Sequence, residues 1–344
     1  MEINEKFKGC LLGGAIGDAL GYPIEFMSLN QIKHNYGLAG LRALIENKES
    51  RVALISDDTQ MTLFTADGLV WASRRCSDEG FGIYTGSGIY QSYLRWLYTQ
   101  TGKIKEKDLL QKTSILDKRE LFSRRAPGNT CLSALESGVM GTIDKPINHS
   151  KGCGGVMRVA PVGLFLHKNP VSAFQTGAEI AAITHGHPTG YLSAGAFSMI
   201  ISEILNEKSI EESINSTVEI LKGYAHHEET LAAIQKAIKL TTTDISHERA
   251  IREIGEGWIA EEALAIALYC ALKESDFEKA LLMSVNHDGD SDSTGSICGN
   301  ILGARLGVKG IPVKWLAAVE LRSFVEIMAE KLYETSELKK EAGK

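Results

Sequence analysis

The sequence predicts an all-α protein. Apolar residues recur at helical spacing, as at Leu231, Ile234 and Ile238, and a similar apolar stripe runs through 61–71. Alternating apolar and polar runs are absent, no Asn-Gly hairpin signal occurs, and only seven prolines interrupt the chain. These three observations favour helices throughout.

Length and composition indicate one domain. The chain has 344 residues, of which 44% are hydrophobic, and this is enough for a sizeable core. No low-complexity linker and no fixed-period repeat divides it. We therefore expect a single domain over 1–344, with its core at about 5–325, a charged surface lobe at 101–125 and a loose C-terminal tail.

Charge and cysteine usage exclude several classes of protein. The net charge is -6 and no basic run occurs, so nucleic-acid binding is not expected. Six scattered cysteines without a C-x-x-C pair favour a reduced, cytoplasmic setting. The longest apolar run, 263–272, is about half of what a bilayer requires, so no membrane span is expected. Without coiled-coil heptads, a monomer is expected.

Glycines recur every four residues in two separate segments. The ridges are Gly9, Gly13, Gly17 and Gly21, and Gly295, Gly299, Gly303 and Gly307. Positions four apart share a helix face, so each ridge predicts a flat strip that another backbone can approach closely. Interior glycine is costly in a helix, which implies that close packing compensates for it.

Between the ridges, SDDTQM (56–61) opens the helix that carries the apolar stripe. Ser is a preferred N-cap and Asp in the first turn complements the helix dipole, so this motif alone marks an ordinary helix start. The stretch NHDGDSDSTG (286–295) repeats the arrangement before the second ridge. Two such helix starts, each with carboxylates beside a hydroxyl, suit hard divalent cations, and four carboxylates would suit two ions about 4 Å apart.

The second acidic stretch does not match a known calcium loop. Counted from Asp288, the sixth position is Ser293 rather than glycine, and the twelfth is Gly299 rather than glutamate. This spacing excludes an EF-hand, so further ligands must come from elsewhere in the chain, and SDD is the natural donor.

Two loop motifs lie between the acidic helix starts. GCGGVMR (152–158) leaves backbone N–H groups free to cradle a phosphate, with an ordinary turn or close helix packing as the alternatives. THGHPTG (184–190) interrupts two helical stretches, and we interpret it as a ligand-contacting break, with structural histidines or a transition-metal pair as alternatives.

Three further segments could border a cleft. Glu25 follows the first ridge, either as a solvated loop acid or as a carboxylate facing the cations. RAPGNT (125–130) and GEGWIAEEAL (255–264) supply turn and cap signals, and Trp258 fits the core and a ligand platform equally.

Taken in order, five motifs resemble the ADP-ribosylglycohydrolase family: GAIGDALGYPIEF, SDDTQM, GCGGVMRVAPVGL, THGHPTGYLSAGA and DGDSDSTGSICGNILGA. The resemblance spans roughly residues 5 to 310. It implies an all-helical domain with two Mg²⁺ or Mn²⁺ ions in a cleft. It also implies an enzyme that releases ADP-ribose from modified side chains.

The resemblance assigns roles residue by residue. It implies metal ligands at Ser56, Asp57, Asp58, Asp290, Asp292 and Ser293. It implies a diphosphate-binding loop at Gly152, Cys153, Gly154, Gly155, Val156 and Met157, and an ADP-ribose contact at His185. Asp288 is not expected to face the cations. Water polarised by the cations is the expected nucleophile, with Asp58, Asp292 or Glu25 as the proton carrier.

The expected reaction is hydrolysis of the N-glycosidic bond between ADP-ribose and an arginine of a modified protein, with free ADP-ribose as product. Two alternatives stay open. One is hydrolysis of another ADP-ribose linkage or of a nucleotide diphosphate, and the other is a non-catalytic ADP-ribose-binding protein.

Overall fold

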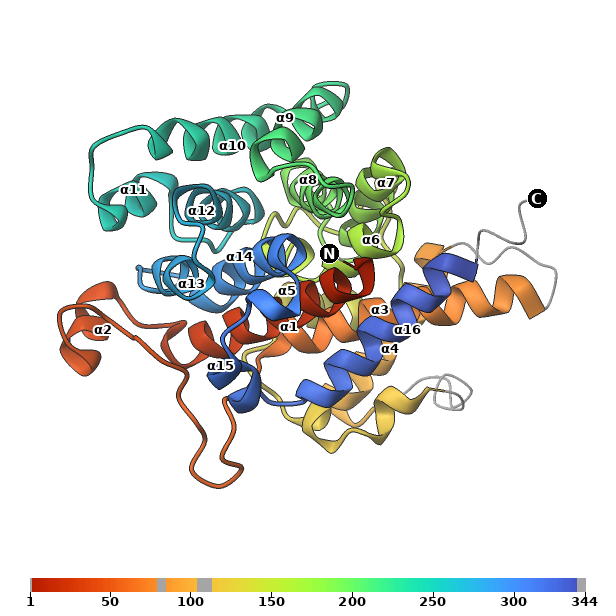
Figure 1. Ribbon diagram of the computed structural model, residues 1–344. Coiled ribbons are helices and arrows are strands. Elements are labelled where there is room, and N and C mark those ends of the chain that lie inside the picture. Colours follow the sequence, from red (N-terminus) through yellow and green to blue (C-terminus); the bar gives the residue numbers. More distant parts are fainter. Residues whose placement is uncertain (1, 79–84, 104–112, 339–344) are drawn as a thin grey trace.

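The structure, a computed structural model, describes residues 2–78, 85–103 and 113–338. Within these ranges every regular element is a helix, and extended pairing is limited to isolated bridges (Figure 1). The all-α prediction is therefore confirmed. Most of the expected charged lobe at 101–125 is described, but 104–112 lies outside the described residues, as does the chain end from 339.

The α-helices are α1 (Ile3–Gly21), α2 (Leu29–Tyr36), α3 (Asp57–Asp78), α4 (Thr85–Thr101), α5 (Asn129–Glu136), α6 (Ala160–Phe165), α7 (Pro170–Ala182), α8 (Pro188–Leu205), α9 (Ile210–Leu221), α10 (Glu228–Thr241), α11 (His247–Ile254), α12 (Ala260–Lys273), α13 (Phe277–Val285), α14 (Ser291–Leu306), α15 (Val313–Ala318) and α16 (Arg322–Leu338). Short 3₁₀ turns are η1 (Tyr22–Ile24), η3 (Ser114–Asp117), η4 (Arg119–Phe122), η5 (Cys153–Gly155) and η6 (Val308–Gly310).

The two glycine ridges face each other at the centre of the molecule, where α1 and α14 lie side by side (Figure 1). A Cβ added at Gly13 would lie 2.2 Å from the carbonyl oxygen of Gly299, and one added at Gly17 would lie 2.0 Å from that of Gly295. These distances leave no room for any side chain. The predicted close approach of two backbones is confirmed, and we call this contact the glycine seam.

The glycine seam is antiparallel. Gly9 of α1 meets Gly303 near the end of α14, whereas Gly21 at the end of α1 meets Ser291 at the start of α14. The last residue of α1 therefore lies beside the first residue of α14, although the two are far apart in the sequence. This pairing decides which loops meet at the candidate site.

Around the seam, buried hydrophobic side chains form one continuous core that extends from Phe7 to Leu332. The first part of the stripe predicted on α3 lies within it, since Met61 and Phe64 are fully buried, whereas Trp71 is only partly buried. A hydrogen bond also joins α1 to α14: the Asn300 side-chain amide donates to the carbonyl of Cys10 at 2.8 Å. The core thus fixes α1, α3 and α14 relative to one another.

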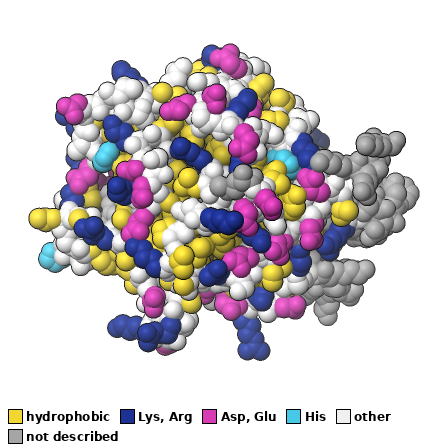
Figure 2. Space-filling view, viewed as in Figure 1, with side chains coloured by type: hydrophobic (Ala, Val, Ile, Leu, Met, Phe, Trp, Pro, Cys, Tyr) yellow, Lys and Arg dark blue, Asp and Glu magenta, His cyan; other side chains and the backbone are white. Residues whose placement is uncertain are grey.

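The surface carries both signs of charge. On the face in Figure 2, basic and acidic side chains are interspersed and do not gather into a single field. No helix among the described residues has the length and hydropathy needed to cross a membrane. The cysteines whose side chains the structure describes are free thiols, and only Cys153 among them is more than slightly exposed.

Candidate active site

The seam ends in a group of buried carboxylates. Glu25, just beyond η1, contributes one carboxylate, and Asp290 and Asp292 at the start of α14 contribute two more. Ligand oxygens of these three residues all lie within 4.8 Å of one another. Even Glu25, the most accessible of them, is only 7% exposed. Like charges packed this closely repel, so the arrangement is costly unless a cation lies among them.

The start of α14 orients its two carboxylates through its own backbone. Asp290 is the N-cap, and its Oδ1 accepts a hydrogen bond of 3.3 Å from the N–H of Ser293. Oδ1 of Asp292 accepts from the same N–H at 2.9 Å. The other oxygen of Asp290 accepts from the thiol of Cys153 at 2.7 Å. These bonds hold both carboxylates at the positive end of the helix dipole.

The start of α3 adds two more buried acids, Asp57 and Asp58. The Ser56 hydroxyl accepts from the N–H of Asp58 at 3.2 Å, as expected for a residue that caps a helix. Asp57 accepts from the N–H of Gly128 at 3.3 Å, so the RAPGNT segment does border the site. Oδ1 of Asp58 is buried and has no hydrogen-bond partner among the described residues.

Asp18 on α1 belongs to the site although the sequence did not single it out. Its fully buried carboxylate accepts from the N–H of Ser56 at 3.0 Å and from the N–H of Thr59 at 3.1 Å, and it also bonds the Thr59 hydroxyl. Asp18 therefore holds the first turn of α3 from a neighbouring helix. The available signal was a single acid within an otherwise apolar and glycine-rich helix, at 9–21.

Burial and mutual repulsion raise the pKa of nearly every acid in this group. Burial, together with the charge of Asp292, raises the pKa of Asp18 to about 7 and that of Glu25 to about 11. The same two causes raise the pKa of Asp57, Asp58 and Asp290 well above the ordinary range. Without a counter-charge, the folded protein thus favours protonated acids here.

The donor set fits divalent cations. Oε2 of Glu25 and Oδ1 of Asp58 are buried, and neither has a hydrogen-bond partner within 2–78, 85–103 and 113–338. A bound cation would relieve this costly state. Carboxylate and hydroxyl oxygens are the donors that Mg²⁺ and Mn²⁺ prefer. In the part of the chain that the structure describes, the carboxylates of Glu25, Asp290 and Asp292 are the one group of three or more metal-type side chains that converge. The transition-metal alternative for the THGHPTG histidines gains no support.

The glycine-rich loop 152–157 lies against this group through Cys153. Gly152 and Cys153 are partly exposed, whereas the residues from Gly154 to Met157 are buried. The loop is fastened to another segment, because the N–H of Cys153 donates a 3.1 Å hydrogen bond to the carbonyl of Trp258. Binding of a diphosphate by this loop stays a prediction.

His185 lies beneath that loop. It is 1% exposed, and a Cβ added at Gly154 would lie 3.0 Å from its ring. One ring nitrogen pairs with the Thr184 hydroxyl at 2.8 Å, and burial together with the charge of Arg158 lowers the pKa of His185 to about 3. The neutral imidazole therefore packs against the buried side of the loop 152–157. A direct contact of His185 with ADP-ribose stays a prediction.

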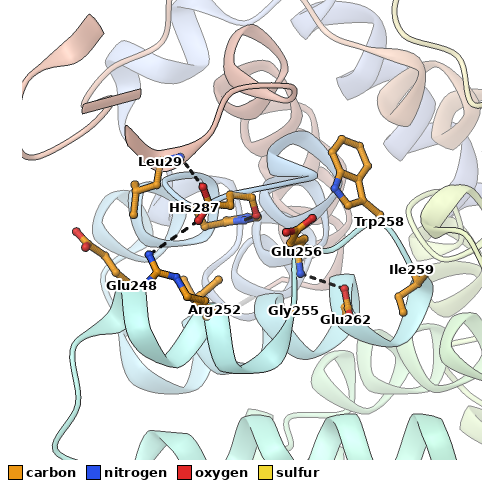
Figure 3. A pocket seen from close by; sticks show the side chains of 11 residues that line it. Leu29, Glu248, Arg252, Gly255, Glu256, Trp258, Ile259, Glu262 and His287 are labelled. Carbon is orange, nitrogen blue, oxygen red and sulfur yellow. Dashed lines mark hydrogen bonds and ion pairs between the residues drawn. The ribbon is translucent and has the colours of Figure 1, made fainter. Parts of the chain in front are cut away.

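Asp288 and Trp258 lie at the edge of the site. Asp288 accepts from the N–H of Leu29 at 2.8 Å and does not belong to the group formed by Glu25, Asp290 and Asp292. Trp258, for which the sequence left core and ligand platform open, is 38% exposed and stacks on Phe26. Asp288 and Trp258 both line a cavity of about 570 Å³ (Figure 3).

Comparisons with known proteins show the family and the fold. A family model described as ADP-ribosylglycohydrolase matches residues 1–342. A protein of Archaeoglobus fulgidus whose name assigns no activity is 30% identical, covering 96% of this chain and 97% of its own. The ADP-ribosylarginine hydrolase Tri1 of Serratia proteamaculans is 23% identical, covering 96% and 80%. A solved structure titled as an ADP-ribosylglycohydrolase-related protein complex shares the fold, with a TM-score of 0.71 at 24% identity over 97% of this chain and 99% of its own.

Proposed function

The chain belongs to the ADP-ribosylglycohydrolase family, and from that premise we propose that it hydrolyses the N-glycosidic bond between ADP-ribose and an arginine side chain of a modified protein. Membership of the family supports ADP-ribosyl hydrolase activity. The observation that carries the proposal is the convergence of the buried carboxylates of Glu25, Asp290 and Asp292. The charge of Asp292 also acts on Asp57 and Asp58 at the start of α3. The arginine linkage is supported by the name of the Serratia relative.

We propose that two Mg²⁺ or Mn²⁺ ions bind at this convergence. The residues that would hold them are Ser56, Asp57, Asp58, Asp290, Asp292 and Ser293. Such ions, when bound, would offset part of the buried negative charge and supply Lewis acidity toward water and ribose hydroxyls. The unpartnered oxygen of Asp58 supports the assignment.

The chain's own residues have three tasks in this proposal. The loop 152–157 holds the diphosphate through backbone N–H groups and so fixes the ribose against the carboxylates. The buried negative charge stabilises the oxocarbenium-like transition state, in which positive charge develops on the ribose. Asp58, Asp292 or Glu25 moves the proton, from the attacking water to the departing guanidino nitrogen.

The balance of the reaction is simple. The bond between the ribose carbon and the guanidino nitrogen breaks, the hydroxyl of water adds to the carbon, and the proton ends on the nitrogen. Glu25 is a candidate to hold a proton because burial raises the pKa of its carboxyl, and its Oε2 has no hydrogen-bond partner among the residues that the structure describes.

The test is release of free ADP-ribose from a protein mono-ADP-ribosylated on arginine, with Mg²⁺ and then with excess EDTA. We expect release with Mg²⁺ and its loss with EDTA. No release would contradict the proposal, and release of AMP in place of intact ADP-ribose would indicate a phosphohydrolase. A serine-linked conjugate in parallel checks the linkage.

We further propose that the chain acts as a monomer in the cytoplasm. The free thiols of the described cysteines support a reducing compartment. The oligomeric state rests on the absence of coiled-coil heptads and is checked by sedimentation equilibrium.

A further inference from the structure

Two exposed aromatic rings stack beside the carboxylate group. Phe26 is 73% exposed and Trp258 is 38% exposed, and their ring centroids lie 5.7 Å apart with an interplanar angle of 18°. Large aromatic side chains usually bury their rings, and adjacent exposed ones commonly mark a surface that binds a ligand. This pair takes no part in the hydrolysis as proposed above.

Both rings are carried by residues that border the carboxylates. Phe26 directly follows Glu25, and Trp258 follows Gly257, whose added Cβ would lie 3.4 Å from the Cβ of Asp290. The backbone N–H of Asp290 also donates a 2.8 Å hydrogen bond to the carbonyl of Glu256. The aromatic pair therefore spans the edge of the site, from the segment after η1 to the segment before α12.

The segment that carries Trp258 is held firmly. The carboxylate of Glu262 accepts from the N–H of Glu256 at 3.0 Å and from the N–H of Gly257 at 3.2 Å. Gly257 has a φ of +85°, a conformation that favours glycine, so the turn suits this residue. A fixed turn gives the ring of Trp258 a defined place next to the carboxylates.

Glu256 adds an available carboxylate beside the aromatic pair. Its side chain is exposed and makes no ion pair with the residues that the structure describes. In Figure 3, the side chains of Glu256 and Trp258 point to the same side of their segment, at the cavity of about 570 Å³. An aromatic face and an unpaired carboxylate thus lie together at the edge of the candidate site.

We propose that Phe26, Trp258 and Glu256 recognise the guanidinium group of the ADP-ribosylated arginine, and so determine which linkage is cleaved. This inference rests on the proposed function. A guanidinium is planar and delocalised, stacks on aromatic faces, and presents a fork of N–H donors to a carboxylate. A serine linkage offers neither the charge nor the plane, and an ammonium offers the charge alone.

The first test compares arginine-linked and serine-linked conjugates in Trp258→Leu and Glu256→Gln variants. Each variant should raise the KM for the arginine conjugate by about tenfold and leave kcat within about twofold, because stacking and pairing act equally before and during bond cleavage. Glu253→Gln is the matched control, since Glu253 is an exposed acid on α11 that pairs with Arg249. It should behave like the wild type.

The second test measures binding without turnover. Methylguanidinium should quench tryptophan fluorescence in the wild type and in Glu253→Gln, but not in Trp258→Leu, whereas methylammonium should have little effect on any of them. Calorimetry with free ADP-ribose should give the same affinity in all variants.

The outcomes separate this inference from the proposed function. Unchanged KM values in both variants, with arginine-linked substrate still cleaved, would overturn the inference alone. Weaker binding of free ADP-ribose by Trp258→Leu would also overturn it, because the ring would then serve the nucleotide. Failure of the wild type to release ADP-ribose from any conjugate would instead contradict the proposed function, and the methylguanidinium titration would still decide whether the aromatic pair binds a guanidinium.

Discussion

The glycine seam and the carboxylate group beside it differ in what lies between the packed segments. Along the glycine seam, the two backbones touch without side chains or charges between them, as at Gly13 and Gly299. Beyond its last pair, Gly21 and Ser291, carboxylates crowd together and resist full ionisation. A rigid contact without charges, such as the glycine seam, can therefore keep two helices together although the carboxylates beside it repel one another.

The costs of the two regions also differ in kind. Each interior glycine lowers helix stability by about 1 kcal/mol relative to alanine, and the close packing of the backbones offsets this. The carboxylates lose hydration and repel one another, a cost that depends on pH and is relieved by cations. Five predictions test this contrast, in order of decreasing effect.

Replacing Gly299 by valine should have the largest effect. Even a Cβ there would lie 2.0 Å from the carbonyl oxygen of Gly13, so α1 and α14 must separate. We expect a loss of more than about 3 kcal/mol in the free energy of unfolding, measured by urea denaturation. Gly223→Ala is the control, because its nearest neighbour is a carbonyl oxygen at 3.2 Å, and it should cost less than about 1 kcal/mol. Equal stabilities of the two variants would contradict the seam.

Replacing Asp57 or Asp292 by alanine should remove catalysis and keep the fold. We expect turnover to fall by at least about 100-fold, because each variant removes a proposed metal ligand. Far-ultraviolet circular dichroism should stay unchanged, since these acids are costly to the fold in the absence of cations. Unchanged turnover in both variants would refute the assignment of the metal site.

Stability in EDTA should fall as pH rises from about 4 toward 7. Asp18 has its pKa raised to about 7, so the folded state binds more protons than the unfolded state over this range, and the free energy of unfolding decreases with increasing pH. Glu25, with its pKa raised to about 11, extends the same trend to higher pH. Mg²⁺ should flatten the profile. Urea midpoints across this range test both statements.

The Asp18→Asn variant measures how much Asp18 contributes to the change of unfolding free energy with pH. The variant loses the titrating group, so its unfolding free energy should vary less between about pH 4 and 7, whatever its absolute value. A profile as steep as that of the wild type would assign the slope to other acids.

Cys153 should give the smallest effect. Its thiol donates to Asp290 at 2.7 Å, and Cys153→Ser keeps a donor in that place whereas Cys153→Ala removes it. In EDTA, we expect the serine variant to match the wild type and the alanine variant to lose about 1 kcal/mol of unfolding free energy. A thermal melt of the three proteins suffices, and equal losses in both variants would show that the hydrogen bond contributes nothing.

Sequence reasoning succeeded where a feature is local. The spacing of the glycines predicted the seam, and the SDD and DSD motifs predicted two acidic helix starts, because a helix fixes which residues share a face or a first turn. The ADP-ribosylglycohydrolase resemblance rested on the same motifs. It is confirmed by the family model, which matches residues 1–342.

What sequence reasoning missed depends on contacts between distant segments. The role of Asp18 is visible only once α1 lies beside the start of α3, and the stacking of Phe26 on Trp258 joins residues from two loops. The burial of His185 beneath the glycine loop is likewise a consequence of packing. Neither propensity nor periodicity encodes such contacts.

The pairing of α1 with α14 also sets when the site can form. During synthesis, α1 emerges from the ribosome before α14. Its glycine face stays uncovered until residues 291–306 have been made. A nascent chain that stalls before α14 therefore has half a seam and lacks the carboxylates of Asp290 and Asp292. Hydrolase activity would then require a chain synthesised at least through α14.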